Sequence, residues 1–225
     1  METEDILEYT EQDVDSNDSL DLSGANLMFT NLRYINLGEA NFSNAKLKEA
    51  DLSHTILSEA DLSQANLIGA NLSCVDLSEA NLTGSDLSNA DLSNANLSEA
   101  ELNGANLSRA NLYQVNLTKA SLLGTMLSQA NLSETNLSHA ILSGADLNKA
   151  NLSQADLSGA SLNWADLSQA NLSQADLSGT DLSWANLSQA DLSGANLNRV
   201  RCNHQTQWPE GFPIDTNELI QKELC

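Results

Sequence analysis

Residues 165–194 read ADLSQ-ANLSQ-ADLSG-TDLSW-ANLSQ-ADLSG, and this five-residue unit decides the fold. From Leu22 to Leu197 every fifth residue is leucine, except for Phe42. A small residue lies two positions before each leucine, aspartate or asparagine usually lies directly before it, and serine usually follows it. A repeat that covers most of the chain predicts one repetitive architecture rather than several globular domains.

A period of five residues fits neither of the two common regular elements. On an α-helix each five-residue step rotates the leucine by about 140°, and on a flat strand successive leucines point to opposite faces. All leucines face one axis only if the backbone turns by a quarter of a circle in each repeat. Four repeats then form a coil of 20 residues, and the whole repeat predicts about nine coils stacked at the strand spacing of about 4.8 Å.

Glycine supports a turn in each repeat. Nine of the 11 glycines lie two residues after a leucine, at the third position of a four-residue turn. A type II turn needs a positive φ there, and glycine adopts it without strain. Five of these glycines share one position in the 20-residue coil, so we expect type II turns mainly on one face and a different turn at corners with Gln or Glu. They are Gly24, Gly84, Gly104, Gly124 and Gly144.

With A-(D/N)-L-S-x as its unit, the chain resembles the pentapeptide-repeat family over residues 21–202. The resemblance implies an all-β fold, a right-handed quadrilateral parallel β-helix. It also implies relatives that are abundant in cyanobacteria. The well-understood activity in that family belongs to members that bind DNA gyrase by mimicking DNA, and these members dimerise through their C-terminal ends.

Two segments flank the repeat. Residues 1–20 hold eight acidic residues and no Lys or Arg, and we expect an acidic cap or a flexible segment there. We expect residues 203–225 to form a C-terminal cap with a short helix, because the stretch 215–218 resembles a capping box. A cap is favoured over a dimer-forming tail, so the chain is expected to be a monomer or a C-terminally mediated dimer. The side chains expected to cover the end of the core are Trp208, Phe212, Ile214, Leu219, Ile220 and Leu224.

The net charge of −22 restricts the possible partners. It argues against direct binding to nucleic acid and to anionic membranes, but it suits a basic protein partner. No apolar run approaches the ~20 residues of a membrane span, and the N-terminal sequence has no features of a secretory signal. Together with three widely spaced cysteines, expected to be free thiols (Cys74, Cys202 and Cys225), this predicts a cytoplasmic location.

The 20-residue coil predicts columns of stacked side chains. Trp164 and Trp184 are one coil apart, so both should project from the same corner and offer a contact for a partner. The alternative is that the two indoles only stabilise each other. Leu123, Met126 and Ile141 fall in adjacent coils and predict a small apolar patch, a second candidate for partner contact.

Acidic residues form two further kinds of column. Glu39, Glu59, Glu79 and Glu99 predict a ladder of carboxylates that suits a DNA mimic, although an ordinary solvated face also tolerates it. The aspartates that precede leucine are expected to hydrogen-bond the local backbone. Calcium needs six to eight converging oxygens, which a flat wall does not offer. The aspartates that stack in this way are Asp146, Asp156, Asp166 and Asp176.

The sequence predicts no catalytic, cofactor or metal site. It has no Gly-rich phosphate loop, no cysteine pair and no nucleophile elbow, and a convex rod lacks the concave pocket of an enzyme. The favoured function is a non-enzymatic interaction, scaffold or regulatory protein. The alternatives are an acidic DNA mimic that binds a topoisomerase (gyrase) or another DNA-binding protein, and a purely structural or stress-related protein.

Overall fold

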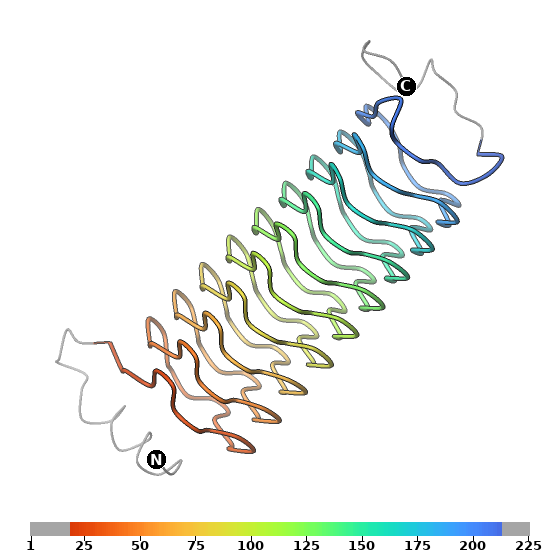
Figure 1. The fold of residues 1–225 in the computed structure, drawn as a ribbon. Helices are drawn as coiled ribbons and strands as arrows, with labels where there is room; N and C mark the ends of the chain where they lie inside the picture. The colour runs from red at the N-terminus through yellow and green to blue at the C-terminus, as the bar shows by residue number, and fades with distance from the viewer. Residues whose placement is uncertain (1–18, 213–225) are drawn as a thin grey trace.

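The computed structural model describes residues 19–212, and in this range the repeat closes into a four-sided coil (Figure 1). These residues contain no helix and no strand longer than one bridging residue. Instead, parallel β-bridges occur at every fifth residue, and each joins residues 20 positions apart, from Asp21 with Asn41 to Asp181 with Arg201. Figure 1 shows the coils stacked into a straight rod. The predicted quadrilateral solenoid of 20-residue coils is confirmed.

The interior of the rod is a continuous stack of leucines. From Leu22 to Leu187 no leucine of the repeat exposes more than 2% of its surface, and Phe42 takes the same inward position. The small residues two positions earlier are also buried, except near the ends of the rod, and this lets the wall approach the core closely. Burial of each leucine stabilises the fold by about 1.5–3 kcal/mol.

The repeat at residues 131–135 shows how the peptide groups are satisfied. Asn131 donates its N–H to the preceding coil at 3.0 Å, while Leu132 and Glu134 donate theirs to the following coil at 2.6 and 3.0 Å. The N–H of Thr135 closes the turn onto the carbonyl of Leu132 at 3.3 Å. The N–H of Ser133 bonds the Oδ1 of Asn131, also at 3.3 Å. All five N–H groups of the repeat therefore have a partner, as buried backbone requires.

Every corner of the coil places a left-handed residue at the same position of its turn. All residues two positions after a repeat leucine have φ between +55° and +70°, whether they are Gly, Gln, Glu, Lys or Trp. The expectation of a different turn at Gln and Glu corners was wrong. Coil closure needs a left-handed residue at each corner, and leucine burial together with the inter-coil hydrogen bonds outweighs the cost of about 1–2 kcal/mol for a non-glycine residue there.

Aspartate and asparagine hold the walls together. Each of the four stacked aspartates accepts the N–H of the residue two positions ahead at 2.8–2.9 Å, which confirms their expected local role. Asparagines also bond across coils: Asn151 Nδ2 donates to Asn131 Oδ1 at 3.2 Å, and Asn186 Nδ2 donates to Asp166 Oδ1 at 3.1 Å. Asparagine placed over aspartate thus links the coils without adding another negative charge.

The last described coil holds one extra residue. Asn186 bridges Gln207, 21 positions on, so the coil extends past the predicted boundary at residue 202. Trp208 and Phe212 stack with ring centroids 5.5 Å apart and pack against the core, as expected for an end cover. The expected helix, its residues Ile214, Leu219, Ile220 and Leu224, and nearly all of the acidic N-terminal segment lie outside the described residues.

Candidate docking surface

Corner residues 20 positions apart form four edges along the rod. Two neighbouring edges carry the residues singled out from the sequence. We call the first the glycine–tryptophan edge, which runs through Gly84, Gly104, Gly124, Gly144, Trp164 and Trp184. We call the second the charged edge, which runs through Glu39, Glu59, Glu79, Glu99, Lys119, His139, Gly159, Gly179 and Arg199.

The two tryptophans stack on the glycine–tryptophan edge as predicted. The ring centroids of Trp164 and Trp184 lie 4.4 Å apart, and the ring planes differ by 7°. Trp164 is 59% exposed and Trp184 is 41% exposed, so the pair presents indole surface to solvent. His204 continues the stack in a tilted orientation at 6.2 Å from Trp184. A rigid, exposed aromatic pair suits contact with a partner.

The apolar patch lies beside the same edge, before the tryptophans. Leu123 directly precedes the corner residue Gly124, Met126 follows it by two positions, and Ile141 lies in the next coil, paired with Ser121. All three side chains are between 42% and 44% exposed. The structure therefore places Leu123 and Met126 beside the edge that carries the tryptophans, about 10 Å before Trp164 along the rod at the usual strand spacing, and Ile141 on an adjoining wall.

Glycine leaves the middle of this edge open. A Cβ atom placed on Gly104, Gly124 or Gly144 would meet no heavy atom within 4 Å. Leu123 and Met126 are therefore separated by a corner that has no side chain. Three successive corners before Trp164 therefore carry no side chain, and apolar side chains flank the corner at Gly124.

The charged edge changes sign along its length. The four predicted glutamates follow one another, and Lys119 then bonds Glu99 at 2.8 Å. The hydrogen bond and the charge of Glu99 raise the pKa of Lys119. His139 and Arg199 lie farther along the edge. The glutamate column is real, but it is acidic only over the N-terminal half of the rod.

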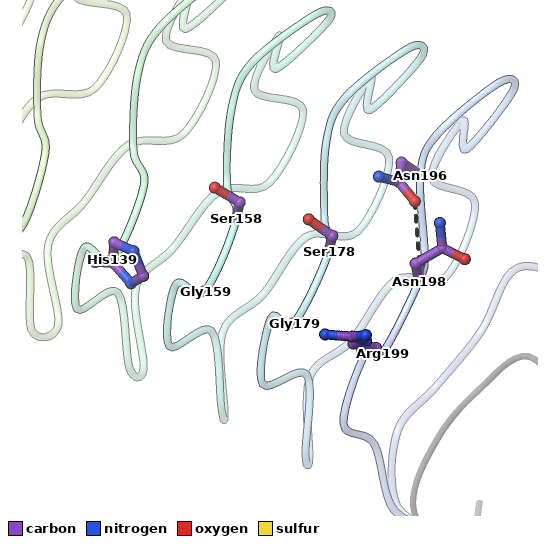
Figure 2. A pocket seen from close by; sticks show the side chains of 8 residues that line it. All are labelled: His139, Ser158, Gly159, Ser178, Gly179, Asn196, Asn198 and Arg199. Atoms are coloured by element: carbon purple, nitrogen blue, oxygen red, sulfur yellow. Dashed lines mark hydrogen bonds between the residues drawn. The ribbon is translucent and has the colours of Figure 1, made fainter.

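A hollow of about 730 Å³ interrupts the charged edge. Figure 2 shows Gly159 and Gly179 between His139 and Arg199, with Ser158 and Ser178 on the adjoining wall. The imidazole leans over Gly159, because a Cβ atom placed there would lie 2.7 Å from the Nδ1 of His139. The sequence analysis did not identify this hollow, although two successive glycines in one column were a signal for it.

The 20-residue spacing also places a second aromatic stack that the sequence analysis missed. Tyr34 and His54 lie on a third edge with ring centroids 4.9 Å apart and planes at 11°. Arg33 lies 5.1 Å from the centre of the Tyr34 ring and bonds its hydroxyl group. Both the guanidinium of Arg33 and the imidazole of His54 therefore contact the ring of Tyr34.

Two other kinds of feature are absent from the described part of the chain. No helix within residues 19–212 is long and apolar enough to cross a membrane. The same residues contain no group of three or more His, Cys, Asp or Glu side chains placed to hold a metal ion. Cys74 is an exposed free thiol, as expected, whereas Cys202 is disulfide-bonded, so the expectation of a free thiol was wrong for Cys202. Cys225 lies outside the described residues.

Comparisons with known proteins agree with the repeat. A profile of pentapeptide repeats (8 copies) matches nine overlapping segments of the chain, which together cover residues 21–201: 21–58, 45–84, 60–98, 76–112, 85–124, 95–133, 127–163, 136–174 and 165–201. A search of curated proteins finds no match.

Some solved structures of pentapeptide repeat proteins are similar to this chain in sequence. HetL, a pentapeptide repeat protein involved in heterocyst differentiation regulation in the cyanobacterium Nostoc sp. strain PCC 7120, is 37% identical. The alignment covers 89% of this chain and 96% of HetL, with a TM-score of 0.50. The pentapeptide repeat protein alr5209 from Nostoc PCC 7120 is 41% identical over 43% of this chain and 84% of its own length, with a TM-score of 0.32.

A more distant structure also aligns with most of the chain. QnrB1, a plasmid-mediated fluoroquinolone resistance protein, is 20% identical over 83% of this chain and 91% of its own, with a TM-score of 0.42. The profile matches, the identity to HetL and the 20-residue coil together show that the chain belongs to the pentapeptide-repeat family.

Proposed function

We propose that this protein is a non-enzymatic scaffold or regulatory solenoid that docks a protein partner through its glycine–tryptophan edge. The observation that carries the proposal is the register that places two stacked indoles on one edge, with Leu123 and Met126 beside the same edge and Ile141 on an adjoining wall. Contiguous exposed apolar groups are typical of protein contact sites. Tryptophan in particular is enriched among the residues that dominate binding energy.

The partner we expect is a basic protein with an extended, arginine-bearing segment. The net charge of −22 attracts such a chain over a long range. At short range a guanidinium group packs favourably over the face of an indole. The open corners at Gly104, Gly124 and Gly144 leave room for an extended main chain to approach the rod.

Two observations support a regulatory rather than a catalytic role. HetL, which aligns over most of both chains, is described as involved in regulating differentiation. Within residues 19–212 no serine hydroxyl group donates a hydrogen bond to a histidine, so none is paired with a base as an activated nucleophile would be.

A binding experiment with matched variants tests the proposal. The tagged protein is used to capture partners from a lysate of the source cells, alongside Trp164→Ala/Trp184→Ala and the control Phe29→Ala. Phe29 is 65% exposed on a different edge. We expect the double tryptophan variant to lose a partner that the wild type and Phe29→Ala retain. Equal capture by all three proteins would reject this edge as the docking site.

The second candidate function is a DNA mimic, which the ladder from Glu39 to Glu99 favours. Carboxylates repeated along one edge of a rod present charges in a line, as phosphates do. Lys119 ends this ladder by pairing with Glu99, which limits its length. A supercoiling assay with purified gyrase tests this function. Inhibition that Glu59→Gln/Glu79→Gln relieves would support it, and unchanged supercoiling at micromolar protein would reject it.

A purely structural or stress-related role is the remaining alternative. It predicts that neither the glycine–tryptophan edge nor the glutamate ladder has a partner. Failure of both experiments above would favour this role.

A further inference from the structure

The charged edge has two halves of opposite character on a single line. Glu39, Glu59, Glu79 and Glu99 occupy four successive coils, and Lys119 occupies the next. The following coils carry His139, two glycines and Arg199, with no acidic side chain at the corner. An edge of this kind is complementary to itself when one copy is reversed.

The hollow in the second half is lined by hydrogen-bond donors that have no acceptor within the described residues. In residues 19–212 the hydroxyl groups of Ser158 and Ser178 and the guanidinium of Arg199 have no hydrogen-bond or ion-pair partner. Gly159 and Gly179 leave space between them, and Arg199 lies next to Gly179 in Figure 2. Hydrogen-bond donors arranged around an open space favour the binding of carboxylate groups.

We propose that two copies of this chain pair antiparallel along the charged edge, so that the glutamates of each copy enter the hollow of the other. The two-fold axis lies midway between the coils of Glu99 and Lys119. This axis places Glu99 against Lys119 of the second copy and Glu79 against its His139. Glu59 and Glu39 then face Gly159 and Gly179, where Ser158, Ser178 and Arg199 supply donors.

Spacing makes this pairing specific. The glutamates of one copy and the positions that they face in the other copy both repeat every 20 residues. Both therefore have the same rise of about 4.8 Å and stay in register along the edge. At the axis, each Lys119 already bonds its own Glu99. Pairing therefore builds a network of two lysines and two glutamates with alternating signs. A two-fold contact of this kind closes on itself and stops at a dimer.

The net charge of −22 on each copy opposes the contact at long range. Salt at physiological concentration screens charges beyond about 8 Å, whereas the paired groups are within direct reach of one another. Dimerisation should consequently be weakest in very dilute salt and should strengthen as salt is raised towards physiological concentration. This dependence is opposite to that of a simple attraction between oppositely charged proteins.

Sedimentation equilibrium at physiological salt, over a wide range of protein concentration, measures the dimer directly. We expect Glu59→Lys/Glu79→Lys to weaken dimerisation at least tenfold, even though it lowers the net negative charge. The matched control is Glu49→Lys/Glu134→Lys, which changes the charge equally on two other edges and should not weaken the dimer. A wild type that stays monomeric at all concentrations would overturn the proposal, as would equal weakening by both double variants.

Two further variants separate specific pairing from general charge. Glu99→Lys should weaken the dimer, and adding Lys119→Glu should restore it, because the swap keeps alternating signs at the axis. Gly179→Gln fills the hollow without changing charge and should weaken the dimer, whereas Gly104→Gln on the glycine–tryptophan edge should not. Glutamine already occupies many left-handed corners, so both changes are compatible with the fold. A dimer unaffected by Gly179→Gln and not rescued by the swap would contradict this geometry.

Discussion

The interior and the corners of this rod follow opposite rules, although both belong to the same repeats. The inward position is leucine in almost every repeat and is buried without exception from Leu22 to Leu187. The corner position has one backbone conformation but carries side chains from glycine to tryptophan. Packing thus restricts the inward position to leucine, while the corner position accepts side chains of different size and charge. Stability should depend on the first position and recognition on the second.

The largest expected effect comes from the interior. Leu132→Ala removes a fully buried side chain from the stack and should lower the free energy of unfolding by about 2–5 kcal/mol. Gln129→Ala, at the corner of the preceding repeat, should change it by less than about 1 kcal/mol. Guanidinium denaturation of both variants measures the difference. Similar losses of unfolding free energy in the two variants would contradict the claim that stability depends on the inward position.

A smaller effect is expected from the wall. The side chain of Asn131 accepts bonds from Ser133 and Asn151 and donates one to Asn111. Asn131→Ala should cost about 1–3 kcal/mol, because several polar groups then lose their partners. The control is Ser153→Ala, which removes a hydroxyl group that makes no side-chain bond within residues 19–212. The prediction fails if the two variants unfold at the same denaturant concentration.

Corner glycines should give an effect of about 0.5–1 kcal/mol. Gly104 has a φ of +65°, and a Cβ atom there has free space, so Gly104→Ala tests backbone strain alone. We expect it to destabilise the fold by roughly that amount. Gln154→Gly, at a corner with φ of +59°, should be neutral or mildly stabilising, since relief of strain offsets the added freedom of the unfolded chain. Stabilisation by Gly104→Ala would contradict the account of the corners.

The smallest effect concerns an exposed ion pair. Glu99 raises the pKa of Lys119, so Glu99→Gln should return that pKa towards its ordinary value. Because the folded pKa is the higher one, the pair contributes at neutral pH and its contribution is lost as pH rises above about 10.4. NMR titration of the lysine side chains in both proteins measures the shift. An unchanged pKa of Lys119 would show that the two groups do not interact.

Sequence reasoning was sufficient for the interior because one side chain repeats at one spacing. A period of five residues allows all leucines to share an axis only in a four-sided coil, and the coil then fixes which residues stack. The pairing of Trp164 with Trp184 and the column from Glu39 to Glu99 followed from that count. The same residue count could have predicted that the apolar patch lies near the tryptophans, since Gly124 and Trp164 are two coils apart in one column.

Other features could not be predicted in the same way. Frequent glycine at some corners suggested that only those corners need positive φ, but closure of the coil imposes it on Gln and Glu as well. The hollow depends on how His139 leans over Gly159 and on side chains of an adjoining wall, and a five-residue pattern does not specify either. The fold is a property of the repeat, whereas the site depends on the departures from it.

The most direct test of the account is the circular dichroism of the tryptophans, since the 20-residue coil alone brings Trp164 and Trp184 into contact. Two indoles stacked at 4.4 Å couple electronically, so their contributions to the spectrum should not be additive. We predict that the spectral change of Trp164→Phe/Trp184→Phe differs from the sum of the changes of the two single variants, whereas the changes of Trp164→Phe and Trp208→Phe add. Additive changes for Trp164 and Trp184 would contradict the 20-residue register.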